Sequence, residues 1–483
     1  MTRLLLGPFN RVEGDLEVRL EVEDGRVSKA WVNAPMYRGF EQILQGKHPF
    51  DAMVIVPRIC GICSVTQSVA AARALAQACG AIAPPNGVHL TNLMLACENA
   101  ADHLTHFYLF FMPDFTREVY ANRVWHAQTH KRFSTLNGEH AREAVAVRQR
   151  WMQIMGTLGG KWPHTQSIVP GGTTRGISAS ERYRLAARVA EMRGFLERVL
   201  YAAALEEVVA LDSEKALEQW CTRDPLKGDL RLFLAIANDL ELENSGRGPA
   251  LTLSYGGFAE PDGHCAMAPG VWNGSSLQAL KIAQIAEDAR HAWLADDGVA
   301  LPPARGLTLP QIDKPDAYTW NKAPRLDAQV LETGALARQL ANGQPLIRAL
   351  WQRTQGNVLT RILARSLELA QLVLLAEHYL RSVVPEAACC VEVQLPEQAD
   401  AYGLCEAARG SLGHWLSVRE GRIANYQIIA PTSWNFSPRD RSGIPGALES
   451  ALVGAVVNDG DKTPVSVQHI VRSFDPCMVC TVH

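Results

Sequence analysis

The sequence has no long apolar run and no concentration of basic residues. No segment approaches the roughly 20 consecutive apolar residues that a membrane-spanning helix needs. The short apolar stretch 4–6 is followed at once by charged residues, unlike a secretion signal. The net charge is −3 and the lysines and arginines form no runs, which argues against nucleic acid as a partner. We therefore expect a soluble, cytoplasmic protein without a transmembrane segment, although a partner subunit could carry a targeting signal.

Cross-links, repeats and flexible linkers are also missing. The 11 cysteines are an odd number at uneven spacing, which argues against a secreted disulfide framework in a chain of 483 residues. There is no internal repeat, low-complexity segment or long Gly/Ser linker. A chain of this length with 47% hydrophobic residues can bury a large core unaided. Seven cysteines are most simply small buried apolar residues: Cys79, Cys97, Cys221, Cys265, Cys389, Cys390 and Cys405.

What the sequence does contain is helical periodicity, preceded by one region of strand-like alternation. Residues 16–32 alternate between apolar and charged side chains around Asp24-Gly25, which predicts a β-hairpin. Ser178 and Glu181 form a capping box that opens a predicted helix reaching about Leu211. Apolar spacing of three and four predicts further helices over 64–79, 89–111, 275–294 and 346–383. Loops are predicted over 163–176, 256–274, 298–324 and 430–445.

These patterns predict a mainly α fold. We expect residues 1–483 to form one large multi-helical domain around a long-helix bundle, with an N-terminal β-hairpin and small β elements.

Two cysteine pairs lie near opposite ends of the chain. Cys60 and Cys63 form one pair, and Cys477 and Cys480 form the other, each with two residues between them. This spacing lets both sulfurs of a pair face one ion, so together the pairs predict a four-thiolate site for a soft metal. A structural zinc site is the simplest alternative, but zinc ribbons usually place their pairs within a few tens of residues. The chain must fold as one unit to bring these pairs together.

Both pairs belong to longer strings that occur in a fixed order. Together these strings resemble the large subunit of the nickel–iron hydrogenases, and the resemblance runs from residue 11 to residue 483. The strings are Arg11-Val-Glu-Gly14, Arg38-Gly-Phe-Glu41, Arg58-x-Cys-Gly-x-Cys63, Ala408-Arg-Gly410, Pro431-Thr-Ser-Trp-Asn435, Ser437-Pro-Arg-Asp440 and Asp475-Pro-Cys-x-x-Cys-x-x-His483.

The resemblance implies a bimetallic centre. Nickel would be held by all four cysteines, with Cys60 and Cys477 terminal. Cys63 and Cys480 would bridge to an iron that carries one carbon monoxide and two cyanides. Soft thiolates suit nickel, and bridging sulfur brings two metals close. Heterolytic cleavage of dihydrogen, the expected substrate, needs an electrophilic metal and a nearby base.

The resemblance also implies a set of charged residues around this centre. Glu13 would relay the proton, received through the sulfur of Cys477. Arg409 would lie over the open nickel–iron position, beside Asp102 and Asp475. Arg58 is expected to belong to the same charged ring. The alternatives are an ordinary surface glutamate for Glu13 and structural salt bridges for the others.

Two further groups follow from the resemblance. Ser433 and the backbone at Ala408 would contact the cyanides, although the family usually has proline at the latter position. Glu41, the carbonyl near Ile429 and His483 would bind a magnesium-type ion that ties down the C-terminus. Because nitrogen is an unusual ligand for magnesium, iron or another divalent ion is an alternative.

Gln67 departs from the catalytic members of the family. These have histidine four residues after the second N-terminal cysteine, and glutamine there resembles the regulatory, dihydrogen-sensing branch. The chain also stops at His483, where catalytic large subunits are normally made with a tail that is later removed. We therefore predict a dihydrogen sensor with low turnover; the alternative is a processed energy-conserving uptake hydrogenase.

The implied partner is a small subunit that carries the iron–sulfur clusters, since no cluster-binding cysteine spacing remains in this chain. The strings Trp162-Pro-His164 and Pro170-Gly-Gly172 resemble the loop that faces the nearest of those clusters. A sensor would also meet a histidine kinase and could form a dimer of heterodimers. The related quinone-module subunit of respiratory complex I is a further alternative, but it lacks the four cysteines.

Overall fold

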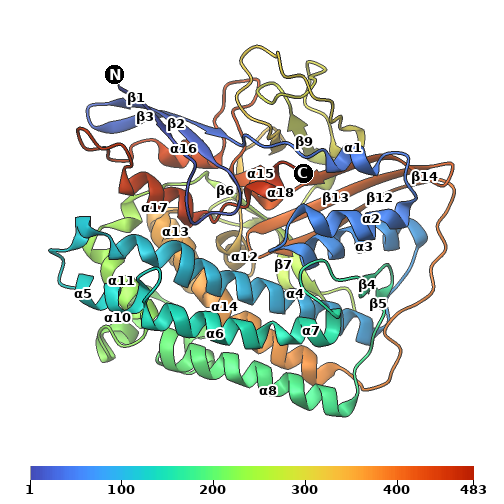
Figure 1. Cartoon of the computed structure of the whole chain (residues 1–483), viewed down its shortest axis with the longest axis horizontal. Coiled ribbons are helices and arrows are strands. Elements are labelled where there is room, and N and C mark those ends of the chain that lie inside the picture. Colours follow the sequence, from blue (N-terminus) through green and yellow to red (C-terminus); the bar gives the residue numbers. More distant parts are fainter. Residues whose placement is uncertain (1) are drawn as a thin grey trace.

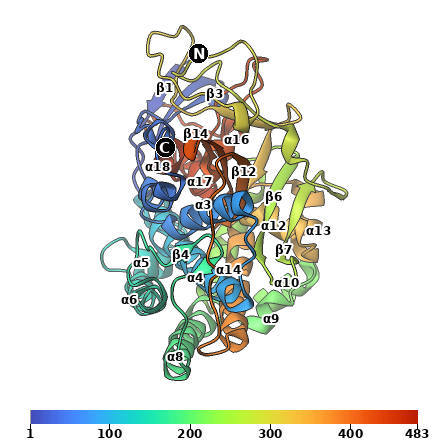
Figure 2. The same ribbon diagram turned by 90° about the vertical axis from the view of Figure 1, so that its right-hand side faces the viewer.

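A long-helix bundle forms the body of the molecule. The computed structural model describes residues 2–483 and confirms the predicted mainly α fold (Figure 1). Helix α14 packs against both α4 and α8, and α6 packs against α8 and α4. Figure 2 shows α3, α4 and α14 in the middle of the molecule, with α8 at its lower end. The long helices are α3 Ser64–Cys79, α4 Pro85–Thr105, α6 Glu139–Trp151, α8 Ala179–Phe195 and α14 Val358–Ser382.

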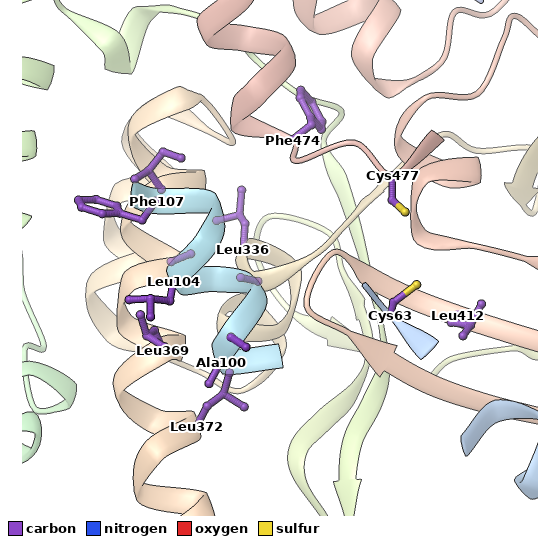
Figure 3. Close-up of a cluster of buried hydrophobic side chains, with 14 of the residues drawn as sticks. Cys63, Ala100, Leu104, Phe107, Leu336, Leu369, Leu372, Leu412, Phe474 and Cys477 are labelled. Atoms are coloured by element: carbon purple, nitrogen blue, oxygen red, sulfur yellow. The ribbon is translucent and has the colours of Figure 1, made fainter. Parts of the chain in front are cut away.

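The interface between α4 and α14 is largely apolar, as the periodicity of both segments predicts. Figure 3 shows Ala100 and Leu104 of α4 beside Leu369 and Leu372 of α14, all within the same buried core. This core runs from the N-terminal strands to the last residues of the chain. The two distant cysteine pairs can therefore meet inside one folded body.

Shorter helices and turns surround the bundle. The helices are α5 His126–Phe133, α7 Gln153–Gly159, α9 Leu205–Val209, α10 Glu214–Arg223, α11 Asp229–Asp239, α12 Ala335–Ala341 and α13 Pro345–Thr354. The helical turns are η3 His106–Phe111, η4 Met112–Thr116, η5 Glu118–Tyr120, η6 Leu196–Leu200, η7 Leu242–Asn244, η8 Ile282–Gln284 and η9 Pro303–Arg305. Within residues 2–483, no helix combines the length and the apolar character that crossing a bilayer requires.

The predicted N-terminal hairpin is present and has one additional strand. Strands β1 Thr2–Leu6, β2 Glu17–Glu23 and β3 Arg26–Asn33 form an antiparallel sheet in that order. Val18 pairs with Val32 and Leu20 with Ala30, and these side chains are buried. The apolar residues of the alternating pattern therefore form one face of the sheet, and this face packs on the core.

The segment from this sheet to the first cysteine pair consists of short helical turns. They are α1 Phe40–Leu44, η1 Pro49–Asp51, α2 Ala52–Ile55 and η2 Val56–Ile59, and α3 starts directly after Cys63. The predicted loop 163–176 contains only the small hairpin β4 Ile168–Val169 and β5 Gly172–Thr173.

Two predictions in the middle of the chain are wrong. Residues 275–294 form no long helix, and residues 256–274 are largely strand rather than loop. The helix-like spacing at 275–294 is overridden by strand partners far along the chain, since β9 pairs with β10. The strands are β6 Leu251–Ala259, β7 Cys265–Trp272, β8 Leu277–Gln278, β9 Ile285–Asp288, β10 Ala323–Leu326 and β11 Leu331–Thr333.

Two predicted helices are shorter than expected. The Ser178–Glu181 capping box is confirmed, but α8 passes into η6 and the helix stops at Leu200 before α9 begins. The predicted helix 346–383 is divided at Gln355, whose backbone is left-handed (φ 58°). The side chain of Asn357 then accepts from the amide of Thr360 and caps α14.

The C-terminal part forms a sheet and a group of short helices that end inside the protein. The sheet has the order β12 Ala399–Ala407, β13 Gly410–Arg419 and β14 Arg422–Ile429. It packs on α3. The helices are α15 Pro431–Asn435, α16 Ala447–Leu452, α17 Val465–Ser473 and α18 Met478–Thr481. His483, the last residue, is only 7% exposed.

Candidate metal centre

The four predicted cysteines converge in space. Their sulfur atoms lie within 4.8 Å of one another, and they are the only such His, Cys, Asp or Glu cluster found among residues 2–483. Cys63 and Cys480 have sulfurs 3.0 Å apart, and Cys60 and Cys477 have sulfurs 3.4 Å apart. All four residues are buried. Figure 3 shows the sulfurs of Cys63 and Cys477 turned toward the same space.

The first pair is held between a helical turn and a capped helix. Cys60 follows η2, and its sulfur accepts from the amides of Ile62 and Cys63 at 3.3 and 3.4 Å. The carboxylate of Glu98, on α4, accepts from the amides of Val65 and Thr66 at 2.8 and 2.9 Å. Glu98 therefore caps the first turn of α3, which fixes the direction in which the chain leaves Cys63.

The second pair is held by the N-terminal segment. The amide of Met478 donates to the carbonyl of Glu13 at 2.7 Å, and the amide of Glu13 donates to the carbonyl of Pro476 at 3.4 Å. The amide of Cys477 donates to Thr432 Oγ1 at 3.0 Å. These bonds place Glu13 directly beside Cys477, as the resemblance implies.

The electrostatics of the cluster favour a bound cation. Burial raises the pKa of both Cys477 and Cys480. Hydrogen bonds from the neighbouring thiols, that of Cys477 first, lower the pKa of Cys60. Four buried sulfurs this close cannot all be thiolates unless a metal cation compensates their charge. The donor set therefore fits a soft metal.

A buried charged group lies beside the cysteines. Arg409 Nη1 is 2.8 Å from Asp102, and its Nη2 is 3.1 Å from Asp475. Arg409 Nε also donates to the carbonyl of Asp475 at 3.1 Å. Asp475 contacts a second arginine, Arg365 of α14, at 3.3 Å. The structure thus brings Arg409, Asp102 and Asp475 together, and it adds Arg365.

The two aspartates differ in their proton affinity. Burial raises the pKa of Asp102 to about 7, although Arg409 opposes this shift. Burial acts on Asp475 in the same direction, but Arg409, His106 and Arg365 outweigh it and lower its pKa to about 2. The neighbouring cations therefore favour the ionised form of Asp475, whereas burial favours the protonated form of Asp102.

Arg58 does not join this cluster, contrary to the prediction. Its side chain is exposed and donates to the carbonyl of Val54. The neighbouring Ile59 is fully buried. In this helical turn Ile59 faces the core and Arg58 faces the solvent. Arg365 occupies the inner place that was predicted for Arg58.

Glu13 is half-buried beside the cysteines. Burial, followed by the charge of Cys60, raises its pKa, whereas Arg409 and Arg38 oppose the shift. A carboxyl group in this position can hold a proton nearer to neutral pH than a surface glutamate does.

The remaining predicted residues around the cysteines are also buried there. Gln67 Oε1 lies 2.8 Å from His414 Nε2, and Gln67 Nε2 has no hydrogen-bond partner within residues 2–483. Ser433 is buried in α15, and its carbonyl accepts from Asn321. The carbonyl of Ala408 accepts from Arg338 at 2.8 Å. An unpaired buried amide at Gln67 is a donor available to a further group in the centre.

The second predicted site is a separate polar cluster at the C-terminus. His483 Nε2 lies 3.1 Å from Glu41, whose carboxylate also accepts from the amide of Ile428 at 2.7 Å. Ile429, the expected carbonyl ligand, follows at the buried end of β14. Lys322 was not predicted: its Nζ lies 3.8 Å from Glu41 and 2.9 Å from Glu287. A cation of the protein itself therefore already balances Glu41.

The sequence interpretation missed Arg365, Arg338 and Lys322. For Arg365 a signal was available, because it and Glu368 are charged residues in the largely apolar and mostly buried helix α14. Charges in such a helix are rarely buried without partners. Lys322 lies in a segment predicted as loop, where a charge gives no such signal.

The predicted partner-facing loop contacts the first cysteine pair. Trp162 Nε1 donates to Glu98 at 3.0 Å, and the amide of His164 donates to Ser64 Oγ at 3.3 Å. His164 Nδ1 lies 2.8 Å from the carbonyl of Pro57. The loop thus packs against both sides of the Cys60–Cys63 segment.

Comparison with known proteins agrees with this geometry. Residues 38–136 and 118–483 match the nickel-dependent hydrogenase family. The periplasmic [NiFeSe] hydrogenase large subunit of Desulfomicrobium baculatum is 30% identical over 100% of this chain and 95% of its own. The hydrogenase-2 large chain of Escherichia coli K12 is 27% identical, over 100% of this chain and 97% of its own.

A solved structure has the same fold. The reduced Ni-Fe-Se hydrogenase of D. vulgaris Hildenborough superposes with a TM-score of 0.86 at 29% identity, over 100% of both chains. The converged cysteines, the full-length match and this shared fold lead to one conclusion: the chain belongs to the nickel-dependent hydrogenase family.

Proposed function

We propose that this chain is the large subunit of a nickel–iron hydrogenase that binds dihydrogen and cleaves it heterolytically. The observation that carries the proposal is the convergence of Cys60, Cys63, Cys477 and Cys480 in one buried cluster. Together they would hold a nickel–iron centre with one carbon monoxide and two cyanides. When bound, this centre supplies the electrophile that polarises dihydrogen.

The protein's own residues orient the substrate and move the proton. Arg409, held between Asp102 and Asp475, presents a fixed positive charge beside the centre. Glu13, held beside Cys477 by main-chain bonds, receives the proton on its carboxylate and passes it outward. Gln67 Nε2 is free to donate to one of the cysteine sulfurs and so to tune the centre.

Infrared spectroscopy under dihydrogen, combined with elemental analysis, tests this proposal on the purified complex. We expect one carbonyl and two cyanide bands, together with nickel and with iron in excess of nickel, since the iron–sulfur clusters of the partner subunit add to the iron of the centre. A protein that contains only zinc and shows no such bands would refute the proposal and support the structural zinc alternative.

The physiological role is the next step of the proposal. The relatives described above are named as hydrogenases rather than as sensors, which favours an energy-conserving uptake enzyme over the predicted sensor. Gln67 is the one observation that favours the sensor as the second candidate. Its side chain contacts His414, whose pKa burial lowers to about 3, so the imidazole is neutral.

Steady-state turnover distinguishes the two roles. With a soluble electron acceptor, turnover well above about 10 per second, the median for enzymes, supports the uptake enzyme. Turnover of the wild type far below that value supports the sensor on one further condition. The Gln67→His variant must keep its nickel and turn over faster than the wild type.

The partners and the location belong to the proposal as well. The relatives' names as large subunits or chains support an iron–sulfur small subunit as the partner, and co-purification tests it. The histidine kinase, the dimer of heterodimers and the magnesium ion stay predictions. The cytoplasmic location also stays a prediction, since one relative is named periplasmic.

A further inference from the structure

Arg409 lies in a tight turn that is buried. Ala407 pairs with Gly410 across β12 and β13, so Ala408 and Arg409 alone form the turn. Both turn residues are 3% exposed. Gly410 has a φ of +134°, and a Cβ there would lie 2.3 Å from Thr333 Oγ1, so glycine is required. Turns of this kind usually lie at the surface and are mobile, so a buried one needs partners for its carbonyls.

Arg338 of α12 supplies those partners. Its Nη1 donates to the carbonyl of Ala407, and its Nη2 to that of Ala408, both at 2.8 Å. These are the two peptide groups directly before Arg409. Arg338 is itself 1% exposed, so its position is set by the surrounding protein.

Two carboxylates fix the guanidinium of Arg338. Glu368 accepts from Nε at 2.9 Å and from Nη2 at 2.6 Å, and Glu406 accepts from Nη1 at 2.6 Å. Together with the two carbonyls, these contacts use all five N–H donors of the side chain. Glu368 also lies 2.8 Å from His103 Nε2. A lysine could not reproduce this set of contacts, since its ammonium has three donors and no planar fork.

The contacts of Arg338 and those of Arg409 are built on the same helices. On α4, Asp102 contacts Arg409 and the next residue, His103, contacts Glu368. On α14, Arg365 contacts Asp475. Glu368 follows three residues later on the same helix and contacts Arg338. The two guanidinium groups are therefore held in a fixed relation through two rigid elements.

Ala408 makes this support necessary. A proline at this position would fix the backbone of the turn with its ring. Alanine leaves that torsion free, so the hydrogen bonds from Arg338 have to restrain the turn.

We propose that Arg338 is a positioning residue for dihydrogen cleavage: it fixes the Ala408–Arg409 turn and so holds the guanidinium of Arg409 over the metal centre. This inference rests on the proposed function. It assigns no contact with substrate to Arg338, which acts only through the backbone of the turn.

The Arg338→Lys variant of the complete complex tests the proposal. We expect kcat for dihydrogen oxidation to fall by about 100-fold, the loss that a misplacement of about 1 Å can cause. KM for dihydrogen should change little, because the charge of Arg409 acts on the cleavage step rather than on the binding of dihydrogen. The carbonyl and cyanide infrared bands of the protein before exposure to dihydrogen should shift, since the charge of Arg409 moves relative to them.

Arg231→Lys is the matched control. Arg231 of α11 is 2% exposed and donates to the carbonyls of Trp220, Tyr201 and Lys227, and none of these partners contacts Arg338 or Arg409. The control should lose thermal stability while keeping the bands and kcat of the wild type. If Arg338→Lys keeps nickel and differs from the wild type no more than this control does, the proposal is overturned.

Two further variants keep the test decisive. If Arg338→Lys does not retain nickel, the Glu406→Gln variant decides the question. Shifted carbonyl and cyanide bands and a lower kcat in this variant support the proposal. Bands and a kcat equal to those of the wild type overturn it. Adding Ala408→Pro to a nickel-containing Arg338→Lys variant should recover part of the lost kcat, and no recovery would contradict a route through the turn. Absence of carbonyl and cyanide bands in the wild type would instead refute the proposed function itself.

Discussion

Two buried polar clusters meet at the last turn of the chain, and they solve the problem of buried charge in opposite ways. Cys477 and Cys480 belong to the thiolate cluster, and His483, three residues later, belongs to the cluster of Glu41. In the second cluster the ammonium of Lys322 contacts Glu41 and Glu287 directly. The recorded hydrogen bonds of the four sulfurs within residues 2–483 come from thiols and backbone amides, and Arg409 lies beside them without such a bond.

The difference shows in the proton affinities. Burial would raise the pKa of Glu41, but Lys322, His483 and a hydrogen bond from Thr308 outweigh it and lower the pKa to about 2. Burial also raises the pKa of Cys477, and there only the neighbouring thiols of Cys480 and Cys63 oppose it, so the pKa stays raised. The comparison teaches that the thiolate cluster requires a metal, whereas the Glu41 cluster can anchor the C-terminus with or without one.

The largest effect should come from removing one sulfur. Cys477→Ser takes away a thiolate that the other three cysteines need to enclose the metal, so we expect nickel retention and dihydrogen cleavage to be abolished. Nickel content and isotope exchange measure this. Cys405→Ser, also at a buried cysteine but outside the cluster, should keep its nickel. Normal nickel in Cys477→Ser would disprove the ligand assignment.

The second effect concerns the proton. Glu13→Gln keeps the main-chain bonds to Pro476 and Met478 but cannot take up a proton, so hydrogen–deuterium exchange with dihydrogen should slow by about 100-fold or more. Nickel and iron contents should stay normal. Asp15→Asn, two residues away and exposed, is the control. Equal exchange rates in both variants would remove Glu13 from the relay.

Much of the thiolate cluster could be predicted from the sequence, because its members lie in ordered strings. Cys60, Cys63, Cys477 and Cys480 were identified in this way, and so was the group of Arg409 with Asp102 and Asp475. Such strings state which residues belong to a site but not which way each side chain faces. Arg58 was therefore placed wrongly, since the turn of η2 directs it to the solvent.

The second cluster could be predicted only in part. Glu41 and His483 follow from the strings, but Lys322 reaches them from a segment whose position depends on the pairing of β9 with β10. The same dependence explains the wrong helix at 275–294. The helices at 64–79 and 89–111 were predicted well, because their own amphipathic spacing decides their structure. Strands paired with distant partners carry no comparable local signal.

The third prediction tests whether Lys322 replaces a metal in the Glu41 cluster. Lys322→Met leaves Glu41 and Glu287 buried without their cation, so metal-free protein should lose about 4 kcal/mol of unfolding free energy. A divalent cation should then restore stability in the variant more than in the wild type. Denaturant unfolding with and without magnesium measures both. If the variant and the wild type have equal unfolding free energies and magnesium stabilises neither one more than the other, Lys322 is not the balancing charge.

The smallest effect is a pH dependence of the Glu41 cluster. Glu41 has a pKa of about 2 in the folded protein against a reference value of 4.5, so between these values the unfolded chain binds the extra proton. Its contribution to stability is therefore complete above pH 4.5 and is lost as the pH falls toward 2. For a shift of this size the loss is at most about 3 kcal/mol.

Glu41→Gln should flatten the stability profile of the metal-free protein between pH 4.5 and 2, relative to the wild type. Glu449→Gln is the control with the opposite sign, because burial raises the pKa of Glu449 to about 7 and its stabilising proton is lost as the pH rises from 4.5 to 7. The unfolding free energy, measured from pH 2 to 4.5 and from pH 4.5 to 7, separates the effects of the two variants. If Glu41→Gln leaves the acidic window unchanged, Lys322 does not hold Glu41 ionised, and the contrast between the two clusters disappears.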